Sequence, residues 1–156
     1  MRAKNKFWIA GGIFLLLFFV GGWWLGFSLK ETSTEGAVRC PDGTEVFVRI
    51  ADESKEQVQG LGGVAELSET EGMLFLYKEP WKASHWMKEM LIPIDILWLL
   101  DGTVVFIAEE VPVPIAGEEL VHYRSSVPAN QVLEVSEGFV AKHGILVGDY
   151  LDVQVP

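Results

Sequence analysis

The sequence contains one cysteine, Cys40, among its 156 residues. A lone cysteine forms no internal disulfide and cannot supply the paired thiolates of a structural zinc site. The three histidines follow no metal-binding spacing, since HExxH is absent. We therefore predict no metal and no cofactor, and we expect the apolar core to hold the protein together.

Basic residues are also scarce, because 12 Lys or Arg stand against 22 Asp or Glu. All 22 acids but only eight basic residues lie at or after Glu31, which gives this part a formal charge of −14. Nucleic-acid backbones are bound by clustered Lys and Arg, and anionic lipid headgroups repel acidic surfaces. Nucleic acid is thus excluded as an expected partner.

No charged residue occurs from Phe7 to Phe27. At about 1.5 Å per residue, a helix of this length crosses the ~30 Å hydrocarbon core of a bilayer. Arg2, Lys4 and Lys6 precede the run, so the positive-inside bias predicts a cytoplasmic N-terminus (1–6) and an extracytoplasmic domain. A cleaved signal peptide is the competing interpretation, but its apolar region is usually shorter and ends in a small-x-small site. We favour a single-pass anchor in the cell membrane.

Residues 28–37 are mostly small and polar, which predicts a linker, and one domain follows over 38–156. Val46, Val48 and Ile50 alternate with less buried positions and indicate the first core strand. Asp52 is placed to cap a short helix that ends at the glycine-rich stretch 60–63. The run 73–77 predicts a strand buried on both faces.

The clearest hairpin joins Ile92–Leu100 to Thr103–Ala108, because Asp101-Gly102 favours a two-residue type I′ turn. In that register Trp98 opposes Val105, Leu97 opposes Phe106 and Ile96 opposes Ile107, while Asp95 is a lone acid among apolar neighbours. The prolines of Val111–Pro114 predict an extended loop up to Glu119 that forms a rim or lid.

Further strands are predicted around Val132–Val135 and Leu151–Val155, with a short helix at Glu137–His143 between them. These elements predict an α+β, β-dominated domain. Its core is a mixed or antiparallel sheet or a partly open barrel with short helices, preceded by the transmembrane helix.

Four segments resemble a known family: GMLF (72–75), HWMKEMLIPIDILWL (85–99), VLEVSEG (132–138) and GILVGDYL (144–151). In this order they are similar to the DUF192 (UPF0127) family. The chain departs from the family at 60–64, where a Gly-Leu-Met-x-Arg type of sequence is usual. The resemblance implies a small β-dominated domain, exported or anchored in bacteria and archaea, without an established activity or transferable catalytic residues.

His85, Asp95, His143 and Asp149 are the residues from which an acid–base or metal site could be built. The structural alternative is that Asp95 accepts backbone N–H groups near a bend and that Asp149 shapes a Gly-Asp turn. Both histidines are then ordinary surface or half-buried side chains. We favour this structural interpretation and predict no catalytic residue.

Aromatic residues, among them Trp81, Trp86 and Trp98, gather in the middle of the domain. Most of them are expected to be core, with Trp81 and Trp86 as the exceptions. The binding hypothesis is a groove edged by Trp86, Lys88 and Asp95, with Asp149 as a fourth ligand-binding candidate. The loop from Pro112 to Glu119 would cover this groove.

The sequence therefore favours a non-enzymatic binding or accessory module, held at the membrane, for an envelope glycan, peptide or protein partner. The alternative is a small envelope hydrolase with an acid–base or metal site around Asp95.

Overall fold

The computed structural model of the protein describes residues 35–156. The predicted cytoplasmic segment, the transmembrane helix and most of the linker lie outside the described residues. Within residues 35–156, no helix has the length and apolar character needed to cross a membrane.

The described chain forms nine strands and two short helices: β1 (Glu35–Arg39), β2 (Glu45–Ala51), α1 (Ser54–Gln59), β3 (Glu71–Trp81), β4 (Ser84–Trp86), β5 (Ile94–Leu100), β6 (Thr103–Val111), β7 (His122–Arg124), β8 (Ala129–Ser136), α2 (Phe139–His143) and β9 (Asp152–Gln154). Seven strands form one sheet in the order β6-β5-β8-β3-β2-β1-β9, and β4 pairs with β7 in a separate two-stranded sheet. Only β2 and β3 pair in parallel in this described region.

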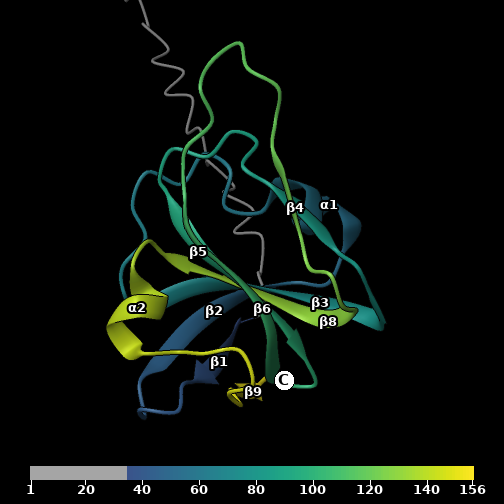
Figure 1. The fold of residues 1–156 in the computed structure, drawn as a ribbon, viewed down its shortest axis with the longest axis vertical. Helices are drawn as coiled ribbons and strands as arrows, with labels where there is room; N and C mark the ends of the chain where they lie inside the picture. Colours follow the sequence, from purple (N-terminus) through teal and green to yellow (C-terminus); the bar gives the residue numbers. More distant parts are fainter. Residues whose placement is uncertain (1–34) are drawn as a thin grey trace, which may run out of the picture. The chain divides into compact units, whose positions relative to one another are not determined.

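The main sheet curls toward closure (Figure 1). The segment before β9 bonds to the start of β6, because the Val104 N–H donates to the Asp149 carbonyl at 2.8 Å and the Leu151 N–H donates to the Gly102 carbonyl at 2.8 Å. Gly102 permits this contact, since a Cβ there would lie 2.7 Å from the Leu151 carbonyl oxygen. The β-dominated fold with short helices predicted from the sequence is confirmed. Of the two arrangements predicted, a mixed or antiparallel sheet or a partly open barrel, the structure has a mixed sheet that curls into a half-barrel.

Two apolar clusters occupy the two faces of the sheet. Leu74, Leu97 and Leu133 belong to one cluster with α2, whereas the neighbouring residues Phe75 and Trp98 belong to the other. Because successive side chains of a strand point to opposite faces, β3, β5 and β8 are buried on both sides. The central apolar runs of the sequence are explained by this double burial.

The Asp101-Gly102 turn is confirmed, and both residues have positive φ, 49° and 82°. The predicted register holds only beside the turn, at Leu99 opposite Val104 and Leu100 opposite Thr103. Beyond it Trp98 opposes Phe106, because Val105 is an extra residue in β6. The bulge shifts the register by one residue, so the predicted pairing of Trp98 with Val105 is wrong, and so are the predicted partners of Leu97 and Ile96. The bulge could not be predicted, because the alternation of residue types does not show it.

Several predicted boundaries also differ from the structure. The first strand begins at Glu35, so residues 35–37 of the predicted linker pair in the sheet. The N-cap of α1 is Glu53 rather than Asp52, because Glu53 is the extended residue directly before the helix and forms a capping box with Glu56. The second helix begins at Phe139, after the left-handed Gly138, and not at Glu137.

Asp95 is fully buried in β5. Its Oδ1 accepts the Glu110 N–H at 2.8 Å and its Oδ2 accepts the Val140 N–H at 2.9 Å. Asp95 therefore ties the end of β6 and the start of α2 to the central sheet. Asp149 has a local role, since its Oδ2 accepts the Leu146 N–H at 2.8 Å within a turn. Both placements match the structural interpretation of these acids.

We expect Asp95→Ala to destabilise the protein by about 3 kcal/mol, because two buried backbone N–H groups lose their acceptors. Asp95→Asn keeps one acceptor, the amide oxygen, so it should destabilise the protein less than Asp95→Ala. Urea unfolding followed by tryptophan fluorescence measures the difference. Glu79→Ala, which changes an exposed acid of β3, is the control and should stay within about 0.5 kcal/mol of wild type. Equal stability of Asp95→Ala and this control would contradict the assignment.

Candidate functional site

A cavity of about 290 Å³ lies between α1, the turn after it, β3, β4 and β8. We name it the His85 cavity. In Figure 1, α1 and β4 lie near each other at one end of the sheet. The lining residues are Ser54, Gln57, Val58, Gln59, Gly60, Leu61, Phe75, Tyr77, Trp81, Ser84, His85, Trp86, Lys88, Met90 and Glu134.

Three side chains form a hydrogen-bonded chain in the wall of this cavity. His85 Nδ1 lies 2.9 Å from Glu134 Oε1, and His85 Nε2 lies 3.1 Å from the Tyr77 hydroxyl. His85 and Glu134 are 6% and 4% exposed, while Tyr77 is half-buried. Ionisable residues are rarely buried this deeply unless they are paired.

We assign the donors and acceptors of this chain with Glu134 ionised and the imidazole neutral. A carboxylate only accepts hydrogen bonds, so Nδ1 of His85 then donates to Glu134. Nε2 is then an acceptor, and the Tyr77 hydroxyl donates to it. Burial raises the pKa of Tyr77, and the charge of Glu134 raises it further, so the phenol stays protonated at neutral pH.

The surrounding core holds the imidazole in place. The rings of Phe75 and Trp98 lie 4.6 and 5.7 Å from the His85 ring, both close to perpendicular. Trp98 is fully buried, and its Nε1 donates to the Ala83 carbonyl at 3.2 Å. Because Ala83 precedes β4, this bond positions the strand that carries His85.

Two indoles lie at the edge of the cavity. Trp81, at the end of β3, is 50% exposed, and its ring centroid lies 5.5 Å from that of Tyr77. Trp86 is 39% exposed, and its ring lies 5.6 Å from His122 on β7. Both therefore escape the core, as the sequence predicted. Lys88 also lines the cavity and pairs with Glu89 at 3.7 Å.

The structure brings together only part of the predicted set. Trp86, Lys88 and His85 line the same cavity, whereas Asp95 and Asp149 are not among its lining residues. The predicted lid, from Pro112, lines a different cavity of about 240 Å³ with Met87 and Tyr123.

His143 lies apart from the cavity, between two acids. Its Nδ1 lies 2.7 Å from Asp42 Oδ2 and its Nε2 lies 3.0 Å from Glu69 Oε1. The Thr44 backbone and His143 lower the pKa of Asp42, and Lys142 and His143 lower that of Glu69. This cluster joins α2 to two loops. In the described residues 35–156, no group of three or more His, Cys, Asp or Glu is arranged to hold a metal ion.

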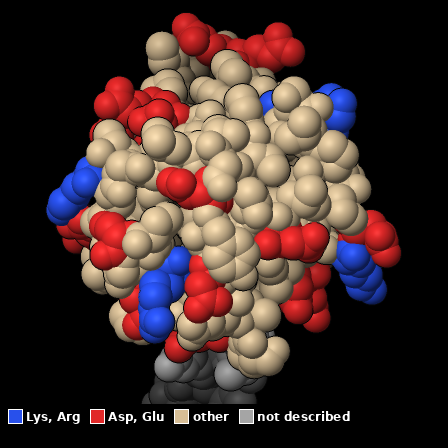
Figure 2. Space-filling model, turned by 60° about the horizontal axis from the view of Figure 1, so that its bottom comes forward, with Lys and Arg blue, Asp and Glu red and all other residues tan. Residues whose placement is uncertain are grey.

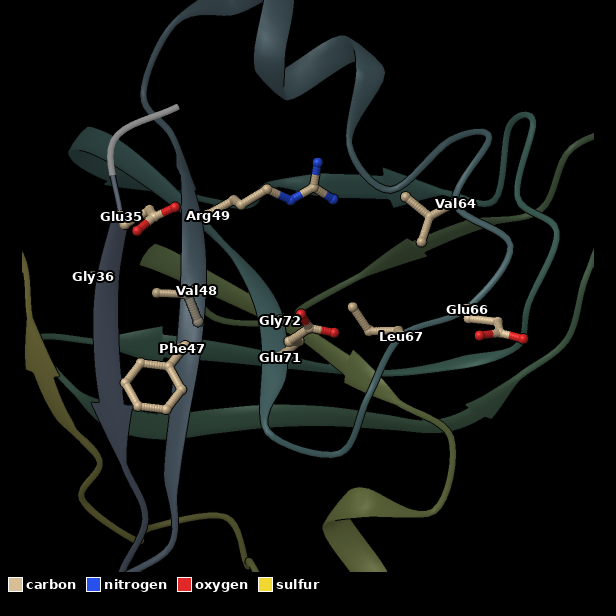
Figure 3. A pocket seen from close by; sticks show the side chains of 10 residues that line it. All are labelled: Glu35, Gly36, Phe47, Val48, Arg49, Val64, Glu66, Leu67, Glu71 and Gly72. Atoms are coloured by element: carbon tan, nitrogen blue, oxygen red, sulfur yellow. The ribbon is translucent and has the colours of Figure 1, made fainter. Parts of the chain in front are cut away.

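A larger pocket, of about 480 Å³, lies on the outer side of β1, β2 and β3 and is bordered by the loop with Val64 and Leu67 (Figure 3). Arg49 extends across it, with Glu35 near one end. The Glu71 carboxylate accepts the Ser68 N–H at 3.1 Å, which lowers the pKa of Glu71. The pocket has no histidine, tyrosine or tryptophan in its lining, so the His85 cavity is the better candidate site.

Tyr77 and Glu134 were missed by reasoning from the sequence. Glu134 carries a signal in retrospect, because an acid between Leu133 and Val135 in a strand buried on both faces needs a partner. Tyr77 carries none, since a tyrosine at the end of an apolar run is ordinary core composition.

Comparison with known proteins agrees with this fold. Residues 37–153 match the DUF192 family, described as "Uncharacterized ACR". A Sinorhizobium meliloti 1021 structure, described as a "putative transcription regulator", has a TM-score of 0.69 and 28% identity over 78% of this chain and 95% of its own. A protein of unknown function from Novosphingobium aromaticivorans DSM 12444 has a TM-score of 0.66 and 30% identity over 76% and 83%. No curated protein matches this chain.

The fold and the cavity define a small β-dominated domain with a hydrogen-bonded candidate site between its sheet and a short helix. The chain belongs to the DUF192 family.

We expect Glu134→Leu alone to cost about 3 kcal/mol, because it leaves His85 buried without its carboxylate. The double variant His85→Phe with Glu134→Leu should recover most of this loss, since an apolar pair can replace a buried, hydrogen-bonded polar pair at little cost. Chemical unfolding of wild type, both single variants and the double variant gives the coupling energy. Additive losses would show that the two residues do not act as a pair.

Proposed function

We propose that this chain is a membrane-anchored, extracytoplasmic module that binds a small polar envelope ligand, a glycan fragment or a peptide, in the His85 cavity without chemical turnover. The observation that carries the proposal is the cavity itself, which has a buried polar wall and exposed indoles at its edge. Ligand sites commonly combine aromatic surface with a few fixed polar groups in this way.

The energetics favour a recognition role for these groups. A buried, hydrogen-bonded polar pair stabilises a fold little compared with an apolar pair of similar size, so its position in the wall of a cavity favours a role in ligand contact. Trp86 and Lys88 add apolar surface and a positive charge at the opening. A cavity of about 290 Å³ lies near the lower end of ligand sites, roughly 300–1,000 Å³, which suits a small ligand.

The hydrolase alternative around Asp95 receives no support from the geometry. Each carboxylate oxygen of Asp95 already accepts a backbone N–H, and the side chain is fully buried. A general acid or base must come within hydrogen-bonding distance of its substrate. We therefore retain the non-enzymatic module as the proposed function.

Anchoring through residues 7–27 is part of the proposal and accords with the surface charge. Figure 2 shows acidic side chains spread over the face in view, with few basic ones between them. Such a surface is repelled by anionic headgroups and by nucleic acid. We therefore expect the domain to lie away from the bilayer surface, where it can bind a ligand or protein partner in the envelope.

Thermal unfolding of the full chain in detergent, with added cell-wall fragments, oligosaccharides or dipeptides, tests ligand binding. A binding probe should raise the Tm according to RT ln(1 + [L]/Kd). Lys88→Ala should reduce the rise, whereas Lys142→Ala, outside the cavity, should leave it unchanged. A rise that Lys88→Ala and Lys142→Ala affect equally would contradict the cavity as the binding site.

Reporter fusions test the anchor. Alkaline phosphatase fused after Pro156 is active only outside the cytoplasm, so we expect activity in intact cells and a full chain that stays with membranes at high pH. Replacing Leu15 and Leu16 with lysine should release the chain from membranes, because charges at the centre of a span are costly. Activity confined to a cytoplasmic reporter would overturn the predicted orientation.

A further inference from the structure

We infer that the His85 cavity recognises a single sugar ring, with Trp81 as the stacking surface and the Tyr77 hydroxyl as an acceptor for a ring hydroxyl. The inference rests on the proposed binding function and assigns its ligand class. It also moves the aromatic contact from Trp86, favoured by the sequence, to Trp81.

Trp81 has the position that a stacking residue needs. It lines the cavity, is 50% exposed, and lies 5.5 Å from the Tyr77 ring at an interplanar angle of 85°. Tyr77 therefore supports Trp81 from one side in an edge-to-face contact. Much of the indole remains in solvent, where it can cover the apolar C–H face of a sugar.

The Tyr77 hydroxyl offers a ligand an acceptor rather than a donor. With Glu134 ionised and the imidazole neutral, Nδ1 of His85 donates to Glu134 and Nε2 accepts the Tyr77 proton, so lone pairs of the phenol oxygen are left for a ligand. A ligand carbonyl or carboxylate finds no donor at this atom, whereas a ligand O–H or N–H finds an acceptor. The preference for a sugar ring over an amide comes from Trp81, whose exposed ring can cover an apolar C–H face.

The size of the cavity limits the ligand. At about 290 Å³ it is just below the usual lower limit for drug-sized ligands, so it suits one ring rather than a chain of rings. Lys88 lies at the edge of the same cavity and can contact further groups of a longer glycan.

Phe47 provides a control with an exposed aromatic ring outside the cavity. It is 60% exposed on β2 and is not among the residues that line the His85 cavity. Trp86 follows His85 on β4 and lines the cavity, and its ring lies 5.6 Å from that of His122. Both indoles adjoin the hydrogen-bonded chain, Trp81 through Tyr77 and Trp86 through His85, so their substitutions are compared with each other and with Phe47→Ala.

The experiment titrates the full chain, kept in a zwitterionic detergent without sugar groups, with N-acetylglucosamine, glucose, galactose and an Ala-Ala dipeptide. NMR signals of the tryptophan indole N–H groups and the backbone amides report where each probe binds. We expect a sugar to shift the Trp81 indole and the cavity amides. Trp81→Ala and Tyr77→Phe should weaken binding at least about tenfold, Trp86→Ala less than Trp81→Ala, and the control Phe47→Ala less than about twofold.

The outcomes separate this inference from the proposed function. If the dipeptide binds in the cavity and no sugar does, the sugar assignment is wrong and the binding module stands. If no probe shifts cavity signals, both are overturned. Sugar binding that Trp86→Ala abolishes and Trp81→Ala leaves intact would also overturn the inference. Thermal unfolding of each variant shows that it is folded.

Discussion

The pairing of Glu134 with His85 is the interaction on which the arrangement above the sheet depends. Glu134 lies in β8, between β3 and β5, where the sheet is buried on both faces. A carboxylate there needs a partner. His85 is that partner, and its position fixes β4 and, through strand pairing, β7. The His85 cavity exists because this hydrogen bond holds the β4–β7 sheet over the main sheet.

Asp95 is a second buried carboxylate with hydrogen-bond partners, on the opposite face of the sheet. It lies opposite Val135 in the register of β5 and β8, whereas Glu134 lies opposite Ile96. The two acids therefore project from adjacent strands to different faces of the sheet. Both carboxylate oxygens of Asp95 accept backbone N–H groups, so this side chain has a structural role. Glu134, on the other face, is connected to the His85 cavity through its hydrogen bond to His85 and the bond of His85 to Tyr77. The same residue type has a structural role on one face and a candidate binding role on the other.

Much of the fold could be predicted from local pattern. Alternation in β2, the Asp101-Gly102 turn and the apolar runs of β3, β5 and β8 follow from period, turn chemistry and burial. β4 and β7 were missed because a three-residue strand carries no period, and the bulge at Val105 is set by neighbouring strands. The pairing of His85 with Glu134 spans 49 residues and could not be read from spacing. The stacking candidate Trp81 was noticed, but its contact with Tyr77 depends on the end of β3.

The account is tested most directly by the imidazole nitrogens of His85, observed by NMR in the chain labelled with nitrogen-15 histidine. With Glu134 ionised and the imidazole neutral, we expect a directly bonded proton on Nδ1, slow exchange of that proton with water, and no proton on Nε2. Glu134→Leu should remove this preference, because it removes the acceptor for Nδ1, while Asp95→Asn should leave it in place. A proton on Nε2 alone, or equal populations of both tautomers, would contradict the hydrogen-bonded chain from which the candidate site is built.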